Sequence, residues 1–153
     1  MSNSATMRAM QIVRSVVIDC HIEDVFRYVA DPFNDPVWCA KVLAVEQVEG
    51  EGTGAGARYE VLHRPLPFRA ARRMTYTCLA YDALGRIVWH ENDGPTVIRV
   101  TYELEPVWTS TRLTQRDEAR LNAPRLLHRL VRAGIGRDVA RQLRTLKQVL
   151  ERR

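Results

Sequence analysis

Residues 16–38 read VVIDCHIEDVFRYVADPFNDPVW, and this stretch decides the fold because a strand, a helix and a bend follow one another in it. Residues 10–19 are rich in Val and Ile, which predicts a β-strand. Apolar residues at helical spacing then predict a one-sided helix over residues 22–30. Pro32 disfavours helical geometry at the residue before it, so this helix ends there and one short turn follows before Trp38.

The chain from residue 41 to residue 121 shows strand patterns separated by turn residues. Gly, Pro, Asn and Asp interrupt it at short intervals, which is typical of tight connections. Short connections join antiparallel neighbours. Residues 97–104 alternate between apolar and polar side chains, as in a sheet with one face on the core. Strands are therefore predicted over residues 41–48, 57–64, 69–81, 86–91, 97–105 and 110–119.

A long amphipathic helix is predicted from Pro124, a residue that suits the first helical turn, to the end of the chain. Its apolar stripe covers about seven turns and consists of Leu127, Leu130, Val131, Ile135, Val139, Leu143, Leu146 and Leu150. Gly134 and Gly136 lie inside the helix and indicate a kink, a close approach by another group, or tight packing on the sheet. Because a sheet and a helix each have one apolar face, they are expected to bury those faces together.

The composition predicts one soluble domain over residues 8–153 after a disordered tail at residues 1–7. No apolar run reaches the roughly 20 residues of a membrane span, and the N-terminus lacks the pattern of a secretory signal. Three widely spaced cysteines favour reduced thiols and a cytoplasmic protein. From Pro124 onward the chain carries nine basic and two acidic residues, which indicates either an anionic partner or a solvated helix face.

Several function classes lack their sequence signatures. The glycine-rich residues 49–58, EGEGTGAGAR, contain no G-x-G-x-x-G, and a strand pattern follows them, so a hairpin connection is favoured over a phosphate site. No common hydrolase motif and no close metal-ligand set is present, so no metal and no cofactor is expected. The basic C-terminal segment contains no Phe, Tyr or Trp, which argues against nucleic-acid binding.

The order of elements resembles the START-like, helix-grip (SRPBCC) superfamily, and within it the polyketide cyclase/dehydrase-like branch. The resemblance spans nearly the whole chain and rests on the opening stretch quoted above, on GTGAGARYEV, GRIVWHENDGP, VTYELEP and TSTRLTQRDE, and on the C-terminal helix. It implies an α+β fold in which a curved antiparallel sheet of six to seven strands wraps around the long helix. It also implies an apolar cavity between them, with Trp38 as its rim or plug.

Strand alternation nominates the side chains that would line such a cavity. The candidate ligand-binding residues are Trp38, Tyr59, His63, Tyr76, Trp89, Tyr102 and Gln115. His63 is also the candidate proton-transfer residue because the ordinary pKa of histidine lies near neutrality, and Tyr76 is the candidate donor to an enolate. The alternatives are a solvent-facing His63 at a strand end, and tyrosines that only pack the core.

Two functions remain open at this point. In the first, the protein binds a small hydrophobic molecule, aromatic, polyketide-like or lipid-like, without chemistry. In the second, it is a polyketide cyclase, aromatase or dehydratase that uses His63 and the tyrosines. A His63 hydrogen-bonded to Glu91 or Asp117 favours the second, and a His63 facing water favours the first. A homodimer through an exposed sheet edge is also expected.

Overall fold

The structure, a computed structural model, describes residues 8–121 and 124–153. The tail predicted for residues 1–7 lies outside this range. The described elements follow the predicted order: β1 (Arg8–Ile18), α1 (Ile22–Val29), the 3-10 turn η1 (Pro32–Asn34), α2 (Asp35–Trp38), β2 (Val42–Glu49), β3 (Arg58–His63), β4 (Arg72–Asp82), β5 (Arg86–Asn92), β6 (Val97–Val107), β7 (Ser110–Leu121) and α3 (Arg125–Glu151).

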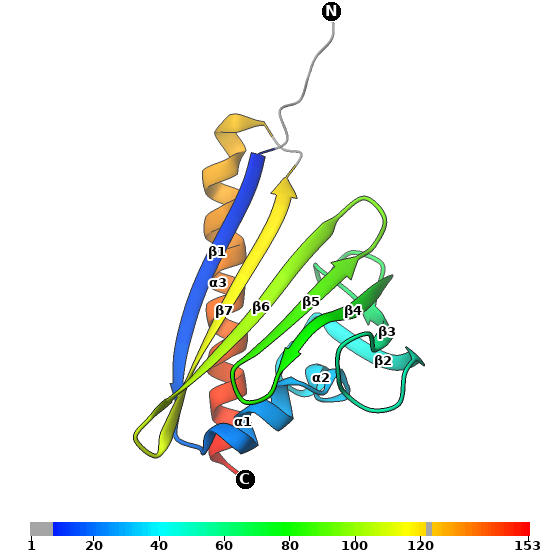
Figure 1. Cartoon of the computed structure of the whole chain (residues 1–153). Helices are drawn as coiled ribbons and strands as arrows, with labels where there is room; N and C mark the ends of the chain where they lie inside the picture. Colours follow the sequence, from blue (N-terminus) through cyan, green and yellow to red (C-terminus); the bar gives the residue numbers. More distant parts are fainter. Residues whose placement is uncertain (1–7, 122–123) are drawn as a thin grey trace, which may run out of the picture.

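The seven described strands form one antiparallel sheet in the order β1-β7-β6-β5-β4-β3-β2. Strands β2 to β7 are sequential neighbours, whereas β1 pairs with β7 across almost the whole chain, from Arg8 opposite Leu121 to Ile18 opposite Thr111. This closing pair leaves β1 and β2 as the sheet edges that the expected dimer would use. Figure 1 shows α3 behind β1 and β7, with α1 and α2 at the lower end of the sheet.

The proline-rich bend after α1 is held by its own side chains. The Asp31 carboxylate accepts a hydrogen bond of 3.0 Å from the Phe33 backbone N–H, which caps η1. The Asn34 amide donates 2.9 Å to the carbonyl of Tyr28, the last turn of α1. These two bonds turn the chain back toward the sheet, so that α2 delivers Trp38 to the core, where its side chain is buried.

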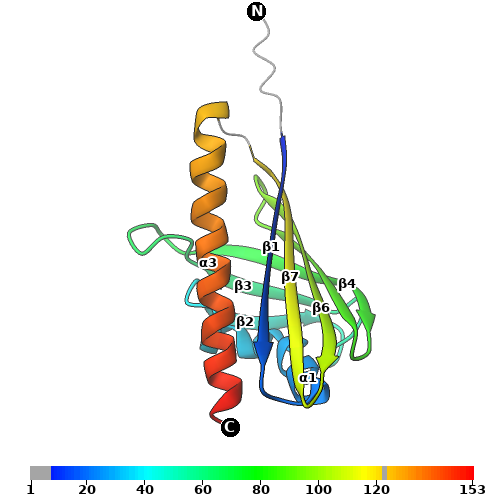
Figure 2. The ribbon, with the colours of Figure 1, turned by 90° about the vertical axis from the view of Figure 1, so that its left-hand side faces the viewer.

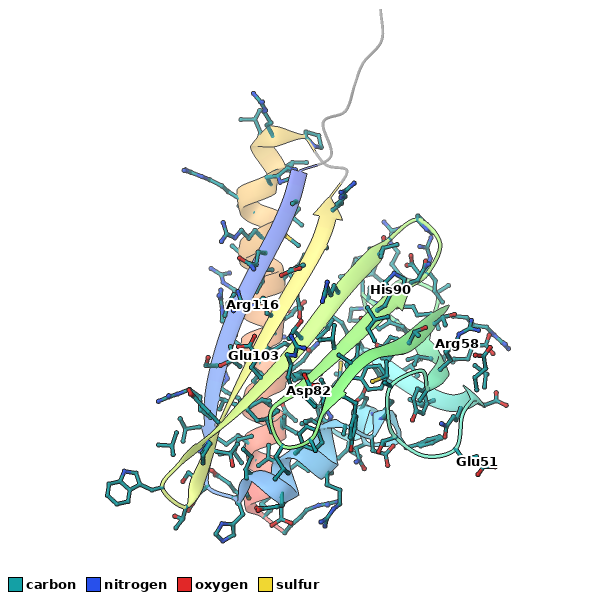
Figure 3. The ribbon with its side chains drawn as sticks, in the orientation of Figure 1. Glu51, Arg58, Asp82, His90, Glu103 and Arg116 are labelled. Atoms are coloured by element: carbon teal, nitrogen blue, oxygen red, sulfur yellow. The ribbon has the colours of Figure 1, made fainter. Side chains whose placement is uncertain are left out.

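The two faces of the sheet differ as the alternation predicts. Trp89 is buried against the core, whereas His90, its neighbour on β5, points to the opposite side. Figure 3 looks onto that outer face, where His90, Glu103 and Arg116 lie on β5, β6 and β7. The inner face carries the hydrophobic core, to which α3 contributes Val139, Leu143, Leu146 and Leu150.

The apolar stripe predicted along α3 is wrong for its first turns. Leu127 is 47% exposed and Leu130 is 71% exposed, while continuous burial begins only at Gly136. Among the described elements the helix packs mainly on β1 and to a lesser extent on α2, and its first turns contribute no buried residue. Figure 2 shows these turns beside the upper ends of β1 and β7, at the opposite end of the sheet from α1.

Gly136 serves a close approach. A Cβ atom at this position would collide with the Arg14 guanidinium of β1, so the glycine gives this side chain room against the helix. Gly134 has open space around it. The close approach considered from the sequence is therefore found at Gly136.

Candidate functional site

The five aromatic residues nominated from the sequence form one buried cluster on the inner face. The ring centroids of Trp38 and Tyr102 lie 6.4 Å apart, and Trp89 lies 5.9 Å from Tyr59 and 6.4 Å from Tyr76. Strand register explains this contact, since Tyr59 on β3 is directly opposite Tyr76 on β4. All five side chains are at most 8% exposed. Five elements of the chain, α2, β3, β4, β5 and β6, thus contribute to one aromatic cluster.

Gln115 lies beside this cluster because it is opposite Tyr102 in the β6–β7 register. Its amide nitrogen Nε2 donates a hydrogen bond of 3.0 Å to Oδ1 of Asp117. Its carbonyl oxygen Oε1 has no partner among the described residues. The indole N–H of Trp38 is likewise buried, and its hydrogen-bonding neighbour is the carboxyl group of Asp35. The cluster therefore contains one buried acceptor without a partner among the described residues, Gln115 Oε1.

Three carboxyl groups surround the aromatic cluster. Glu91 on β5 is opposite Tyr76, and Asp117 on β7 is opposite Val100 on β6. Asp35 lies at the start of α2, close to one helical turn before Trp38. The alternation that nominated Trp89 and Gln115 puts Glu91 and Asp117 on the same faces, so the sequence contained that signal. The sequence contained no such signal for Asp35, because the Asp35-Pro36 pair indicates only a bend.

Burial changes the protonation of these carboxyl groups. It raises the pKa of Glu91 well above its ordinary value, and the nearby Asp117 and Asp35 raise it further. It raises the pKa of Asp117 to about 6, against the opposing effects of the Gln115 hydrogen bond and of Lys41. Burial and then Asp31 raise the pKa of Asp35, against the opposing effect of a side-chain hydrogen bond with Trp38. Burial therefore favours the neutral form of these carboxyl groups, which can donate a hydrogen bond as well as accept one.

The tyrosines of the cluster remain protonated. Burial raises the pKa of Tyr76 well above its ordinary value, and the Glu91 carboxyl adds to the effect. Burial, followed by Asp35, does the same for Tyr102. Both phenols are hydrogen-bond donors at any physiological pH.

His63 occupies the edge of the site instead of its centre. It is the last residue of β3, half-buried, and its pKa is lowered by burial and by the Lys41 ammonium, with Asp93 opposing. The described hydrogen bond to the Asp117 carboxylate comes from Gln115 and not from His63. The arrangement that would have favoured chemistry at His63 is therefore not formed with Asp117.

An ion pair closes the same edge. The Nζ atom of Lys41 lies 2.8 Å from Oδ2 of Asp138, which joins the residue before β2 to α3. Because Lys41 lowers the pKa of both Asp117 and His63, its charge acts on both groups. Lys41 and Asp138 were not nominated from the sequence, since no local pattern pairs residues 97 positions apart.

Surface hollows of about 710, 310 and 500 Å³ share no residue with the aromatic cluster. The largest lies over the ends of β1, β6 and β7, and the third lies between α1 and the end of α3. Within residues 8–121 and 124–153, no three His, Cys, Asp or Glu side chains are grouped to hold a metal ion. No helix in the described part of the chain is both long and apolar enough to span a membrane.

The chain was compared with protein-family models, curated sequences and solved structures. Residues 9–151 match the family described as polyketide cyclase/dehydrase and lipid transport. No curated protein sequence matches the chain. The ZhuI aromatase/cyclase from a Streptomyces species superposes with a TM-score of 0.78 at 13% identity, over 95% of this chain and 96% of that one. TTHA0849 from Thermus thermophilus superposes with a TM-score of 0.74 at 20% identity, over 92% and 97%.

A third neighbour is the di-domain aromatase/cyclase BexL from the BE-7585A biosynthetic pathway. It superposes with a TM-score of 0.71 at 18% identity, over 93% of this chain and 46% of that one. At these identities the likeness concerns the helix-grip fold, which the sequence predicted.

Proposed function

The chain belongs to the polyketide cyclase/dehydrase and lipid transport family, and on that premise we propose that it binds a small hydrophobic molecule between the sheet and the helices. The molecule is aromatic, polyketide-like or lipid-like and contacts the cluster of Trp38, Tyr59, Tyr76, Trp89 and Tyr102. Gln115 contributes a polar contact, and His63 lies where the molecule enters.

One observation carries this proposal: an unpaired polar atom and buried carboxyl groups lie beside an aromatic cluster. A buried donor or acceptor left unpaired costs about 1–3 kcal/mol. Gln115 Oε1 is such an atom, and the carboxyls of Glu91 and Asp117 lie nearby. A core selected only for stability would hold apolar residues here. Such unpaired groups are characteristic of a site that is completed by a ligand or by bound water.

Cyclase or dehydratase chemistry is the second candidate. The lowered pKa of His63 keeps its imidazole neutral near pH 7, which suits a base that removes an acidic proton next to a carbonyl. Tyr76 would donate its O–H to the developing enolate oxygen. The raised pKa values of the Glu91 and Asp35 carboxyls favour their protonated forms, which would serve as further proton donors at this site.

Native mass spectrometry of the protein purified from its own host, followed by denaturing extraction, tests the proposal. An aromatic or lipid-like molecule retained at one copy per chain is the expected result. Repeated preparations without any bound molecule, together with no saturable binding of added hydrophobic probes, would overturn it.

The recovered molecule then separates binder from enzyme. Turnover of this compound by the wild-type protein and its loss in His63→Ala would establish chemistry at His63. The matched control is His90→Ala, because His90 lies on the outer face of β5, opposite the face that carries Trp89. Unchanged compound after incubation with wild-type protein would leave the binding function alone.

A further inference from the structure

The hollow of about 500 Å³ between α1 and the end of α3 is lined by side chains of both charges. Asp24 and Arg27 come from α1. Asp31 lies just beyond this helix, and Arg153 lies just beyond α3. Because residues three and four apart share one face of a helix, Asp24, Arg27 and Tyr28 project from the same side of α1. The hollow shares no residue with the aromatic cluster, so what it binds is independent of the proposed function.

The four charged side chains of this hollow lack ion-pair partners. Among residues 8–121 and 124–153, every ion pair is formed by other side chains. The Asp31 carboxylate uses one oxygen to accept the Phe33 backbone N–H and keeps the other. Two carboxylates and two guanidinium groups therefore line one hollow without pairing, and their charges sum to zero.

Tyr28 supplies a second and independent sign of a ligand. It lines the same hollow and is only 4% exposed, and its buried hydroxyl has no hydrogen-bond partner in the described part of the chain. The guanidinium carbon of Arg153 lies 4.6 Å from the centre of its ring. Burial raises the pKa of Tyr28 against the opposing effect of Arg153, and Asp35 raises it further, so the hydroxyl remains a donor. A buried donor requires an acceptor, and an anionic acceptor placed here would also meet Arg153.

The two signs of charge restrict the ligand. A simple anion bound to Arg153 would also face the carboxylates of Asp24 and Asp31. A simple cation bound to those carboxylates would face the guanidinium groups instead. Only a molecule that carries both charges gains from each side of the hollow, because opposite charges attract and like charges repel at these short separations.

We propose that this hollow binds a small zwitterion with one carboxylate and one ammonium group. The ligand carboxylate accepts a hydrogen bond from the Tyr28 hydroxyl and pairs with Arg153, while Arg27 adds positive charge from the same side of α1. The ligand ammonium donates to the carboxylates of Asp24 and Asp31.

Four compounds with the same four-carbon skeleton test the proposal: 4-aminobutyrate, L-2-aminobutyrate, butyrate and butylammonium. Each is titrated into the ¹⁵N-labelled protein, and saturable NMR shifts of the amides around the hollow give its affinity. At least one of the two zwitterions is expected to bind roughly two- to fivefold more tightly than either singly charged compound, as partly exposed ion pairs allow. The tighter of the two zwitterions then reports the spacing of the two charges in the natural ligand.

Three variants assign the two ends of that zwitterion. Tyr28→Phe keeps the ring and removes the hydroxyl, and Arg153→Gln removes the cation. Each should abolish the advantage of the zwitterion over butylammonium while preserving its advantage over butyrate. Asp24→Asn should do the reverse. The Tyr28 hydroxyl should account for roughly a three- to tenfold change in affinity.

Arg152→Gln and Glu23→Gln are the matched controls, because both residues are exposed neighbours in the sequence that do not line the hollow. Neither control should change any affinity. If Tyr28→Phe fails to fold, Arg153→Gln and Asp24→Asn still decide, because both replace exposed side chains.

The opposite results would overturn the proposal. Butyrate or butylammonium binding as tightly as both zwitterions would show a site for a single charge. Equal weakening by Arg152→Gln and Arg153→Gln would show that only the general surface charge acts. The absence of saturable shifts with either zwitterion would remove the site altogether. None of these results bears on binding at the aromatic cluster.

Discussion

The Lys41 ammonium lies 2.8 Å from the Asp138 carboxylate and thereby joins the start of β2 to α3 across the edge of the candidate site. Both side chains are partly exposed, at 28% and 37%, so this ion pair contributes at most about 1 kcal/mol to stability. Its larger consequence is electrostatic, because Lys41 also lowers the pKa of Asp117.

We predict that Lys41→Met raises the pKa of Asp117 above its value of about 6 in the wild-type protein. The physical reason is the loss of a nearby positive charge that favours the ionised carboxylate. Titration of the Asp117 carboxyl carbon by NMR measures the change. Lys147→Met is the control, since the Lys147 ammonium pairs with Glu151 at 2.6 Å on another part of α3. An Asp117 pKa that is the same in both variants would contradict the prediction.

Asp117 should also make stability depend on pH. Its pKa is about 6 in the folded protein and 3.8 ordinarily, so the folded state holds a proton that the unfolded chain releases between these values. The contribution of Asp117 to stability therefore falls as pH rises from about 4 to about 6 and stays constant above that range. Replacing the ionisable Asp117 carboxyl by a neutral group should therefore stabilise the folded protein at neutral and alkaline pH.

Asp117→Asn is accordingly expected to be more stable than the wild-type protein by about 2 kcal/mol at pH 8, and equally stable near pH 3.5. Denaturant unfolding at both pH values measures the difference. Glu118→Gln is the matched control, because Glu118 is the next residue on β7 and is exposed. A lower stability of Asp117→Asn at pH 8 would show that the carboxylate is stabilised by its surroundings.

Two leucines of α3 should respond very differently to truncation. Leu146 is fully buried, so Leu146→Ala should lower the free energy of unfolding by about 2–5 kcal/mol. Leu130 belongs to the same apolar stripe but is 71% exposed, so Leu130→Ala should change it by less than about 0.5 kcal/mol. Chemical denaturation measures both. A loss at Leu130 as large as that at Leu146 would mean that the first turns of α3 are covered in solution.

Trp108 occupies an unfavourable backbone conformation in the β6–β7 turn. Its φ is 57°, in the left-handed region that glycine adopts freely, and its side chain is 98% exposed. Trp108→Gly should therefore stabilise the protein by about 0.5–1 kcal/mol, because strain is relieved and no burial is lost. Thermal unfolding measures the gain. Thr109→Gly is the control, since Thr109 does not have a positive φ and should gain nothing.

The order and type of the elements could be read from the sequence because their signals are local. The alternation along residues 97–104 and the helical stripe of residues 22–30 depend only on near neighbours, and the structure forms β6 and α1 there. The same alternation assigned Tyr59, Tyr76, Trp89 and Tyr102 to the inner face, where they are buried. Local periodicity reports which side of an element is apolar, which is why these assignments succeeded.

Tertiary structure alone decided which apolar faces are buried and which side chains come together in the candidate site. Leu127 and Leu130 of the α3 stripe stay exposed because β1 and α2 contact only part of the helix. Asp35, Glu91 and Asp117 come from α2, β5 and β7, and they approach one another only after the sheet has formed. The pairing of Lys41 with Asp138 has the same origin. A side chain's protonation and partners depend on elements distant in the sequence, which no local pattern encodes.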